Sequence, residues 1–301
     1  MSKIVCLFLI ALAGANAMTF NVTNRLSSGN LAAEAQFPYM ASLQQTSLAT
    51  APTRGHVCGG VLITLQHVLT AASCMFTFGP NGVQTAINLQ QYRVFAGATT
   101  LSNDADPNRY RNLLSSNVHP DFIASSHLND IAIITLVTPF INSTSIRALP
   151  LPGPLVGPPE MSSCTIAGWG TDGTTAEGTP SLNLKFANKY VYSQSLCQKV
   201  YAGLSNSPNV FPSMICSASH DIISTGCLGD EGGPLVCNGL LSGILVFTNN
   251  CYPTAFPEVY TRVSNYTVWA RSITGAASTF QPGVLVFVFA LVQIFVSKFV
   301  N

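Results

Sequence analysis

The sequence predicts an all-β protein made of two β-barrels that follow each other along the chain. Short apolar runs recur between loops rich in Gly, Pro, Asn and Ser, and their length is typical of strands. A proline-rich connector, residues 148–160, lies near the midpoint and divides the chain into two β-rich halves. Because a closed sheet leaves no exposed edges, we expect each half to form a barrel.

Individual elements follow from the local pattern. Residues 265–273 repeat apolar positions at helical spacing, so we expect one amphipathic helix at the end of the folded part. A long loop, residues 44–55, follows the first strand. The clearest strands are predicted at residues 60–63, 91–95, 131–137 and 241–247.

The first 17 residues have the form of a secretory signal peptide. Lys3 supplies the positive start, residues 4–13 are apolar, and Ala15-Asn16-Ala17 is a small-x-small cleavage site. The apolar run is too short for a transmembrane helix, which is the alternative interpretation. Residues 1–17 therefore predict a secreted or extracellular protein.

The C-terminal residues form a hydrophobic tail that predicts attachment to a membrane. Small residues at 275–278 precede a short spacer and a largely apolar run from Gly283 to Asn301, the pattern of a GPI-attachment signal. A transmembrane helix in which Lys298 snorkels to the surface is the alternative. Either interpretation makes residues 276–301 an anchor at the cell surface.

Charge is scarce throughout the chain. Lys and Arg number 13, Asp and Glu number 12, and together they make up 8 % of the residues, against about 25 % in an ordinary soluble domain. The net charge of +1 provides no basic surface for nucleic acid. Disorder is excluded as well, because 48 % of the residues are hydrophobic.

Cysteine usage agrees with secretion. Of the nine cysteines, Cys6 belongs to the signal peptide. The remaining even number indicates four disulfides, although spacing alone leaves about a hundred pairings open. No CxxC or HxxxH pair supports metal binding, and we expect neither a metal nor a cofactor.

Several motifs, in order, resemble the trypsin/chymotrypsin family of serine proteases over about residues 25–273. They are FPYMASL from Phe37, HVCGGVLI from His56, LTAASC from Leu69, NDIA from Asn129, CTIAGWG from Cys164 and GDEGGPL from Gly229. The resemblance implies a domain at residues 26–275 with the trypsin-like fold. That fold consists of two six-stranded antiparallel β-barrels and a C-terminal helix.

Two kinds of covalent modification are expected. The Asn-x-Ser/Thr pattern predicts N-glycosylation at Asn142 and Asn265, whereas a third match at Asn21 would be lost with the pro-segment. For the disulfides, the resemblance implies the pairs Cys58–Cys74, Cys164–Cys237, Cys197–Cys216 and Cys227–Cys251.

The resemblance also implies an activation apparatus. Arg25-Leu26 resembles the activation bond, with residues 18–25 as a short pro-segment and the amine of Leu26 as the partner of Asp230 after cleavage. His56 and Ser42 align with the residues that hold this Asp before cleavage. The three are either a retained switch or buried polar groups that need one another as hydrogen-bond partners.

The aligned catalytic positions lack the residues that acyl transfer needs, namely a Ser nucleophile, a His base and an Asp that orients the His. Here the Ser position is Glu231, the His position is Ser73, and only Asp130 stands. A carboxylate is a poor nucleophile toward an amide, and a Ser hydroxyl does not titrate near neutral pH. In a comparable enzyme, losing the Ser or the His alone lowers turnover by about six orders of magnitude.

No other histidine has the spacing of a replacement base. His67 lies in the strand before the AASC motif, His119 lies in a loop, and His127 is expected to be exposed. Asp130 and Glu231 as a carboxylate pair for glycoside hydrolysis remain an alternative, although nothing else in the sequence resembles a sugar cleft.

The specificity pocket departs from the family as well. Thr248 and Glu258 align with wall positions that are usually glycine, and Thr225 aligns with the base of the pocket. Only a missing side chain lets a substrate residue enter such a slot. We expect Glu258 to fill it.

These substitutions predict a non-catalytic serine protease homologue that acts as a binding or regulatory protein around a protease cascade. Its expected partners are a protein, such as an active protease or its substrate, and a membrane. Loops on a rigid scaffold carry such functions, and residues 44–55 are one candidate. The alternatives are an active serine endopeptidase and a carbohydrate- or lipid-binding surface protein.

Overall fold

The computed structural model describes residues 29–275, apart from 52, 80–82, 102–105, 172–178, 205–206, 221–224 and 249–255. The predicted signal peptide, pro-segment, activation bond and hydrophobic tail lie outside the described residues. Within the described ranges, no helix is long and apolar enough to cross a membrane.

The first half of the chain closes into a six-stranded antiparallel barrel. Val61 pairs with Leu69, and Leu69 pairs with Ile133 on the next strand. All three side chains are fully buried, because paired residues of neighbouring strands point to the same face. In spatial order the strands are β2 (Met40–Gln45), β3 (His56–Leu62), β4 (His67–Thr70), β9 (Ala132–Leu136), β8 (Tyr110–Val118) and β7 (Tyr92–Ala96).

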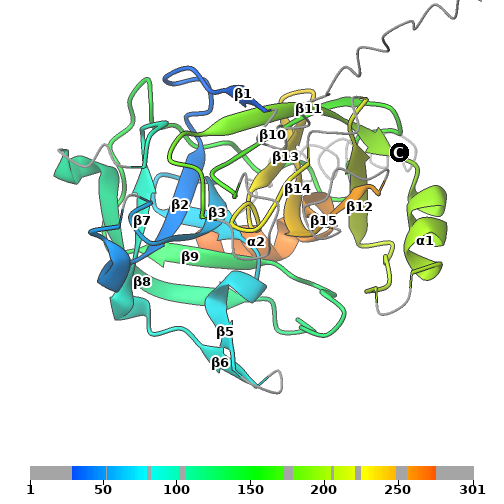
Figure 1. The fold of residues 1–301 in the computed structure, drawn as a ribbon. Coiled ribbons are helices and arrows are strands. Elements are labelled where there is room, and N and C mark those ends of the chain that lie inside the picture. The colour runs from blue at the N-terminus through cyan, green and yellow to red at the C-terminus, as the bar shows by residue number, and fades with distance from the viewer. Residues whose placement is uncertain are drawn as a thin grey trace, which may run out of the picture.

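The second half forms a matching barrel, which closes where β12 pairs with β11. The connector at 148–160 contains no helix or strand and joins β9 to β10, so the predicted division between the barrels is correct. Figure 1 shows the two barrels side by side. The strands of the second are β11 (Lys185–Tyr192), β10 (Ser163–Gly168), β13 (Pro234–Cys237), β14 (Leu240–Phe247), β15 (Glu258–Arg262) and β12 (Met214–Ala218), with β1 (Asn30–Leu31) added beside β11.

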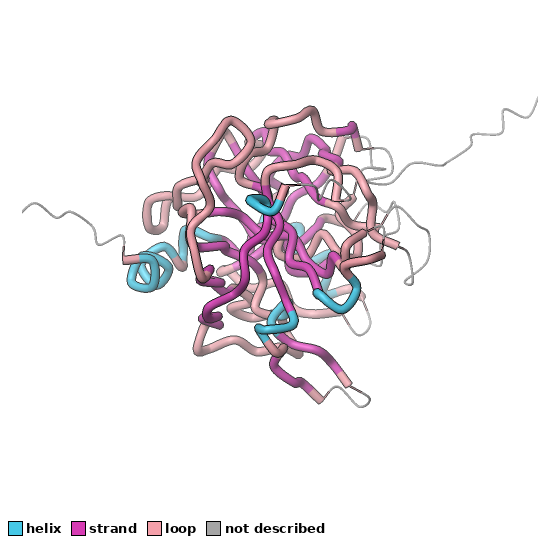
Figure 2. The backbone as a smooth tube through the Cα atoms, turned by 90° about the vertical axis from the view of Figure 1, so that its left-hand side faces the viewer, coloured by secondary structure: helices cyan, strands magenta, loops and turns pink. Residues whose placement is uncertain are grey.

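Shorter elements decorate this core. The hairpin of β5 (Phe76–Phe78) and β6 (Gln84–Ala86) projects from the body of the protein (Figures 1 and 2). Short 3-10 turns lie at Thr46–Leu48, Ser73–Met75, Leu89–Gln91, Pro107–Arg109 and Val263–Asn265.

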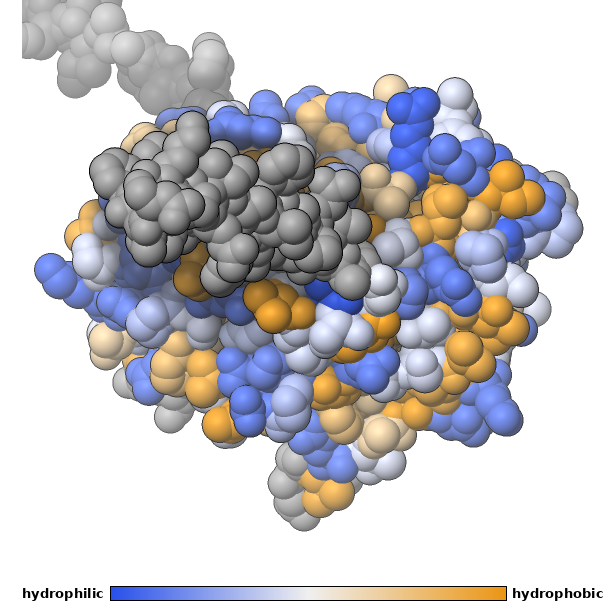
Figure 3. All heavy atoms as spheres, turned by 180° about the vertical axis from the view of Figure 1, so that it is seen from behind, coloured by the Kyte–Doolittle hydropathy of each residue, from blue (hydrophilic) through white to orange (hydrophobic). Residues whose placement is uncertain are grey.

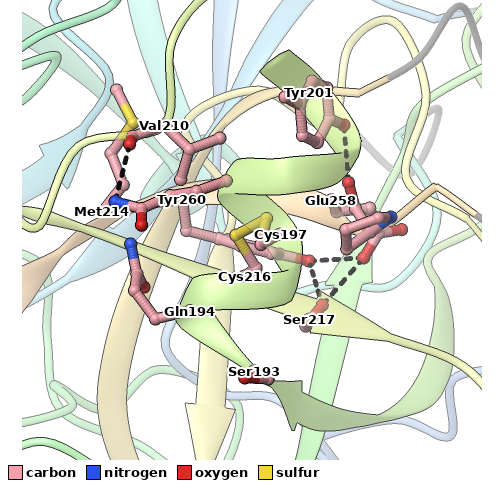
Figure 4. Close-up of a disulfide and its surroundings, with 12 residues drawn as sticks. Ser193, Gln194, Cys197, Tyr201, Val210, Met214, Cys216, Ser217, Glu258 and Tyr260 are labelled. Carbon is pink, nitrogen blue, oxygen red and sulfur yellow. Dashed lines mark hydrogen bonds between the residues drawn. A yellow bond between two sulfur atoms is a disulfide. The ribbon is translucent and has the colours of Figure 1, made fainter. Parts of the chain in front are cut away.

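The helices are α1 (Gln194–Ala202) and α2 (Thr267–Thr274). The predicted C-terminal helix corresponds to α2, and the four predicted strands coincide with β3, β7, β9 and β14. The sequence does not predict α1, because nine residues with only Cys197 and Tyr201 buried are too short a pattern to separate from a loop. The Cys197–Cys216 disulfide ties this helix to β12 (Figure 4).

Three of the four predicted disulfides are confirmed. Cys58 is bonded to Cys74, Cys164 to Cys237 and Cys197 to Cys216. Cys227 is disulfide-bonded as well, and its predicted partner Cys251 lies outside the described residues.

We expect the stabilisation from each disulfide to follow the length of the loop that it closes. The Cys197–Cys216 bond closes a separation of 19 residues and the Cys164–Cys237 bond a separation of 73. In the chain-entropy account, replacing both cysteines by Ala lowers the free energy of unfolding by about 3 kcal/mol for the short loop and about 4 kcal/mol for the long one. Urea unfolding followed by tryptophan fluorescence measures both values, and a larger loss for the short loop would contradict the prediction.

Candidate active site

The three positions aligned with the catalytic triad meet where the two barrels touch. The N–H of Gly59, in β3, donates to the carbonyl of Glu231 at 2.8 Å, which joins the first barrel to the turn before β13. Ser73 begins the 3-10 turn after β4, and Asp130 lies two residues before the start of β9. Ser73 and Glu231 line the same cavity of about 320 Å³. The structure therefore brings Ser73, Asp130 and Glu231 together in one site.

Asp130 is fully buried and its carboxylate has two partners. One oxygen accepts from the backbone N–H of Ser73 at 2.8 Å, and the other is paired with Nδ1 of His127 at 2.8 Å. A hydroxyl from the second barrel, that of Thr261, donates to the Asp130 carbonyl at 2.7 Å. The carboxylate is thus held by the backbone at the old His position and by the imidazole of a different histidine.

The expectation that His127 is exposed is wrong. Its side chain is 27 % exposed and bonded to Asp130, because the turn before β9 folds back on itself. His127 and Asn129 have φ values of 52° and 55°, in the left-handed region that His and Asn adopt more readily than most residues. The available signal was the spacing of a His and an Asn just ahead of a buried Asp.

The Glu231 carboxylate turns back onto the backbone of its own turn. Its Oε2 accepts from the N–H of Gly229 at 2.7 Å, and its own backbone N–H donates to it as well. Gly229 has a φ of +93°, which a residue with a side chain adopts only under strain. The family uses these two N–H groups as the oxyanion hole. In this chain a carboxylate occupies them.

Burial sets the protonation behaviour of Glu231. Loss of water raises the pKa of its carboxyl, whereas the N–H groups of Glu231 and Gly229 and the nearby His127 lower it and Asp130 raises it again. The net result is a pKa above the usual range.

The predicted activation residues are only partly brought together. Ser42 and His56 are hydrogen-bonded at 2.7 Å, but Nε2 of His56 donates to the carbonyl of Gly229 at 2.9 Å rather than to Asp230. Burial lowers the pKa of His56 to about 4, so the ring is neutral and Nδ1 accepts from the Ser42 hydroxyl.

Asp230 is bound by the backbone instead. Its carboxylate accepts from the N–H of Gly170 at 2.7 Å and from that of Cys227 at 2.9 Å. Burial still raises its pKa to about 7, against the effect of these two donors. Arg25 and Leu26, the predicted activation bond, lie outside the described residues.

Glu258, which aligns with a wall of the specificity pocket, is 2 % exposed. The ammonium of Lys189, from β11, donates to Oε1 at 2.8 Å, and Gly226 N–H donates to the same oxygen. Oε2 accepts from Ser217 at 3.0 Å and from Tyr260 at 2.7 Å (Figure 4). Burial alone would raise the pKa of Glu258, but Lys189 and the hydrogen bonds outweigh it and hold the pKa below its usual range.

The other two pocket residues surround the same point. A Cβ placed on Gly226 would lie 2.9 Å from Leu245, 3.6 Å from Glu258 and 3.8 Å from Thr248. Thr225 precedes Gly226, and its hydroxyl donates to the Gly226 carbonyl at 3.3 Å. Side chains of the protein itself therefore fill the space around Gly226.

Sequence reasoning missed Lys189, although the strand pattern contained a signal. Along β11, Ala187, Lys189 and Val191 are all buried, as expected for alternate residues that face one side of a strand. A charged residue on an inward face needs a buried partner. The lone Glu at an expected glycine position was that partner.

Two further predictions concern surface sites and metals. Asn142 and Asn265, the predicted glycosylation sites, are both exposed. In the part of the chain that the structure describes, no group of three or more His, Cys, Asp or Glu side chains is arranged to hold a metal ion.

Removing one member of the Lys189–Glu258 pair should be much more damaging than removing both. Lys189→Met leaves a buried carboxylate without its counter-ion and is expected to lower the free energy of unfolding by about 3–5 kcal/mol. The double variant Lys189→Met, Glu258→Gln recovers most of this loss, because the amide oxygen still accepts from Ser217 and Tyr260. Urea unfolding provides the comparison, and equal losses in the single and double variants would contradict the pairing.

Comparison with known proteins identifies the family. The family model described as Trypsin matches residues 26–270. Kallikrein-8 of Rattus norvegicus is 33 % identical over 225 residues, which cover 73 % of this chain and 77 % of the relative. Trypsin of Sus scrofa is 30 % identical over 253 residues, or 84 % of this chain and 97 % of the relative.

Solved structures agree with the sequence comparison. Neuropsin, a serine protease expressed in the limbic system of mouse brain, superposes with a TM-score of 0.67 at 29 % identity, over 82 % of this chain and 98 % of that one. Human heparin binding protein superposes with a TM-score of 0.66 at 27 % identity, over 82 % and 96 % of the two chains. Motifs, paired barrels and comparisons agree, and the chain belongs to the trypsin family.

Proposed function

We propose that this trypsin-family chain is a non-catalytic homologue that acts outside the cell as a binding or regulatory protein. One observation carries the proposal: the residue at the nucleophile position is Glu231, and its carboxylate accepts from the Gly229 N–H at 2.7 Å. Acyl transfer needs these donors for the developing oxyanion. A resident carboxylate both lacks nucleophilicity toward an amide and competes for the donors.

The filled specificity pocket supports the same proposal. Glu258 and Lys189 form a buried ion pair in the slot that would receive a substrate side chain. A substrate would have to displace two desolvated charges, and breaking such a pair is strongly unfavourable. Recognition of a substrate residue at this position is therefore not part of the proposed function.

A protein partner contacts the surface loops in this proposal. Residues 46–55 connect β2 to β3, because residues 44 and 45 of the predicted loop belong to β2, and Leu48 is 49 % exposed. Gln45 and Val57, at the two ends of this connection, line the cavity that also contains Glu231. The loop and the cavity thus form one continuous surface, which we propose as the contact region.

Charge argues against a polyanionic ligand. The name of the human heparin binding protein states that it binds heparin. In this chain, ten of the thirteen basic residues and all twelve acidic residues lie between residues 26 and 275, which gives a net charge of about −2. Figure 3 shows hydrophilic and hydrophobic residues interspersed over the part of the back face that it colours. We do not extend heparin binding to this chain.

Wild-type protein should not react as a serine hydrolase, even after activation. We expect no labelling by a fluorophosphonate probe and no turnover of a panel of peptide amides, because Glu231 offers no hydroxyl. The protein is assayed before and after limited trypsin treatment, with peptide mapping to establish cleavage after Arg25. Porcine trypsin is the positive control. Turnover of the peptide amides that co-purifies with this protein would overturn the non-catalytic assignment in favour of an active endopeptidase.

Attachment to the cell surface through residues 276–301 is the second part of the proposal. The small residues at 275–278, the spacer and the apolar run from Gly283 favour a GPI anchor. Phosphatidylinositol-specific phospholipase C should therefore release the protein from intact cells into the medium. A known GPI-anchored protein serves as the control for the lipase. Retention of this protein on the same cells would contradict the GPI anchor and favour a transmembrane tail.

A further inference from the structure

We propose that His127 stands in for the missing catalytic histidine, so that the cleft is a latent acyl-transfer centre in which only the nucleophile is absent. The inference goes beyond the proposed function, because it assigns a chemical capacity to a cleft that Glu231 blocks. It rests on the position of His127 relative to Asp130 and to the turn that carries residue 231.

The imidazole of His127 is paired with the carboxylate of Asp130. Nδ1 of His127 lies 2.8 Å from an oxygen of the fully buried Asp130 carboxylate. An ionised carboxylate only accepts, so Nδ1 carries the proton and Nε2 of the neutral ring has the lone pair. The Ser73 N–H binds the other carboxylate oxygen at 2.8 Å and fixes its orientation. This is the tautomer that a general base needs.

Hydrogen bonds and packing fix the turn that carries His127. The amide of Asn129 donates to the Asp121 carbonyl at 2.8 Å, and its oxygen accepts from the Tyr266 hydroxyl at 2.7 Å. The His127 ring packs against Phe247, with centroids 5.4 Å apart. The ring therefore packs on β14, while Tyr266, just before α2, fixes the turn that carries it, and the side chain is 27 % exposed.

His127 and residue 231 belong to the same site. Ser73, whose N–H binds the Asp130 carboxylate that His127 also contacts, lines the same cavity as Glu231. The Glu231 carboxylate is held by the N–H groups of Gly229 and of residue 231 itself. A Ser at 231 would leave both donors open to an oxyanion, and in the inferred centre the His127–Asp130 pair would serve its hydroxyl.

In the reaction expected of the Glu231→Ser variant with a fluorophosphonate, the Ser oxygen attacks phosphorus. An O–P bond forms and the P–F bond breaks. The hydroxyl proton passes to Nε2 of His127 and fluoride leaves, so that the net by-product is HF. Asp130 keeps its hydrogen bond to Nδ1 and stabilises the imidazolium that forms during the step.

The test compares labelling rates of purified, cleaved variants with a biotinylated fluorophosphonate. We expect E231S to be labelled at residue 231, as identified by peptide mass, and E231A to be unlabelled. E231S/H127Q keeps a donor for Asp130 but has no base, and it should be labelled about 10²–10⁴-fold more slowly than E231S. E231S/H220A is the matched control, because His220 stacks on Tyr190, outside the site, and its rate should equal that of E231S.

Two results would overturn the inference. The first is that E231S, folded and with the melting temperature of the wild type, stays unlabelled. The second is that E231S and E231S/H127Q are labelled at the same rate. Reactivity of the wild type would contradict the proposed function and leave these comparisons intact.

A second nucleophile keeps the inference testable if E231S folds poorly. Cys at 231 should react with iodoacetamide as a thiolate that His127 promotes, since a neighbouring imidazolium lowers the pKa of a thiol. We expect the alkylation rate of E231C to persist to a lower pH than that of E231C/H127Q. Coinciding pH profiles for the two variants would contradict the assignment of His127.

Discussion

The close approach of two backbones between the barrels is the constraint on which the rest of the site depends. Gly59 in β3 donates to the Glu231 carbonyl, and a Cβ on Gly59 would lie only 3.0 Å from Cα of Gly233. No side chain fits between the strand and the turn. The turn that carries residue 231 is therefore held against the first barrel, near the disulfide of Cys58 and Cys74.

That constraint explains why the site keeps its geometry although its residues have changed. The positions of Ser73 and Asp130 are set by β4 and β9, and that of Glu231 by the turn packed on β3. Barrel packing and disulfides determine these positions, and none of them depends on catalysis. The side chains at the site can vary as long as each buried polar group has a partner.

The sequence predicts the fold well because many independent features agree. Alternating strand patterns, the connector at 148–160 and the paired cysteines all report on burial and topology, which depend on residue type more than on exact identity. The short helix α1 is missed because nine residues contain little periodicity, and its stability comes from the bond between Cys197 and Cys216.

The site is predicted less completely, for a different reason. Alignment places Ser73, Asp130 and Glu231 together, but the partner of each depends on local backbone shape. His127 reaches Asp130 only because it and Asn129 adopt left-handed conformations, which residue spacing does not report. Lys189 pairs with Glu258, which is 69 residues away in the sequence, and no local sequence pattern reports a pair so far apart.

The two glutamates share one physical explanation. Each has hydrogen-bond donors at its position: the N–H groups of Gly229 and residue 231 for Glu231, and the Gly226 N–H, the Ser217 and Tyr260 hydroxyls and the Lys189 ammonium for Glu258. An oxyanion hole is built to stabilise negative charge in a dry site, so a carboxylate placed there is satisfied without new partners. Glu258 is buried and needs the Lys189 ammonium as well as the neutral donors, whereas Glu231 is only partly buried. The donors that stabilise an oxyanion in a protease are thus the groups that satisfy the carboxylate at residue 231 here.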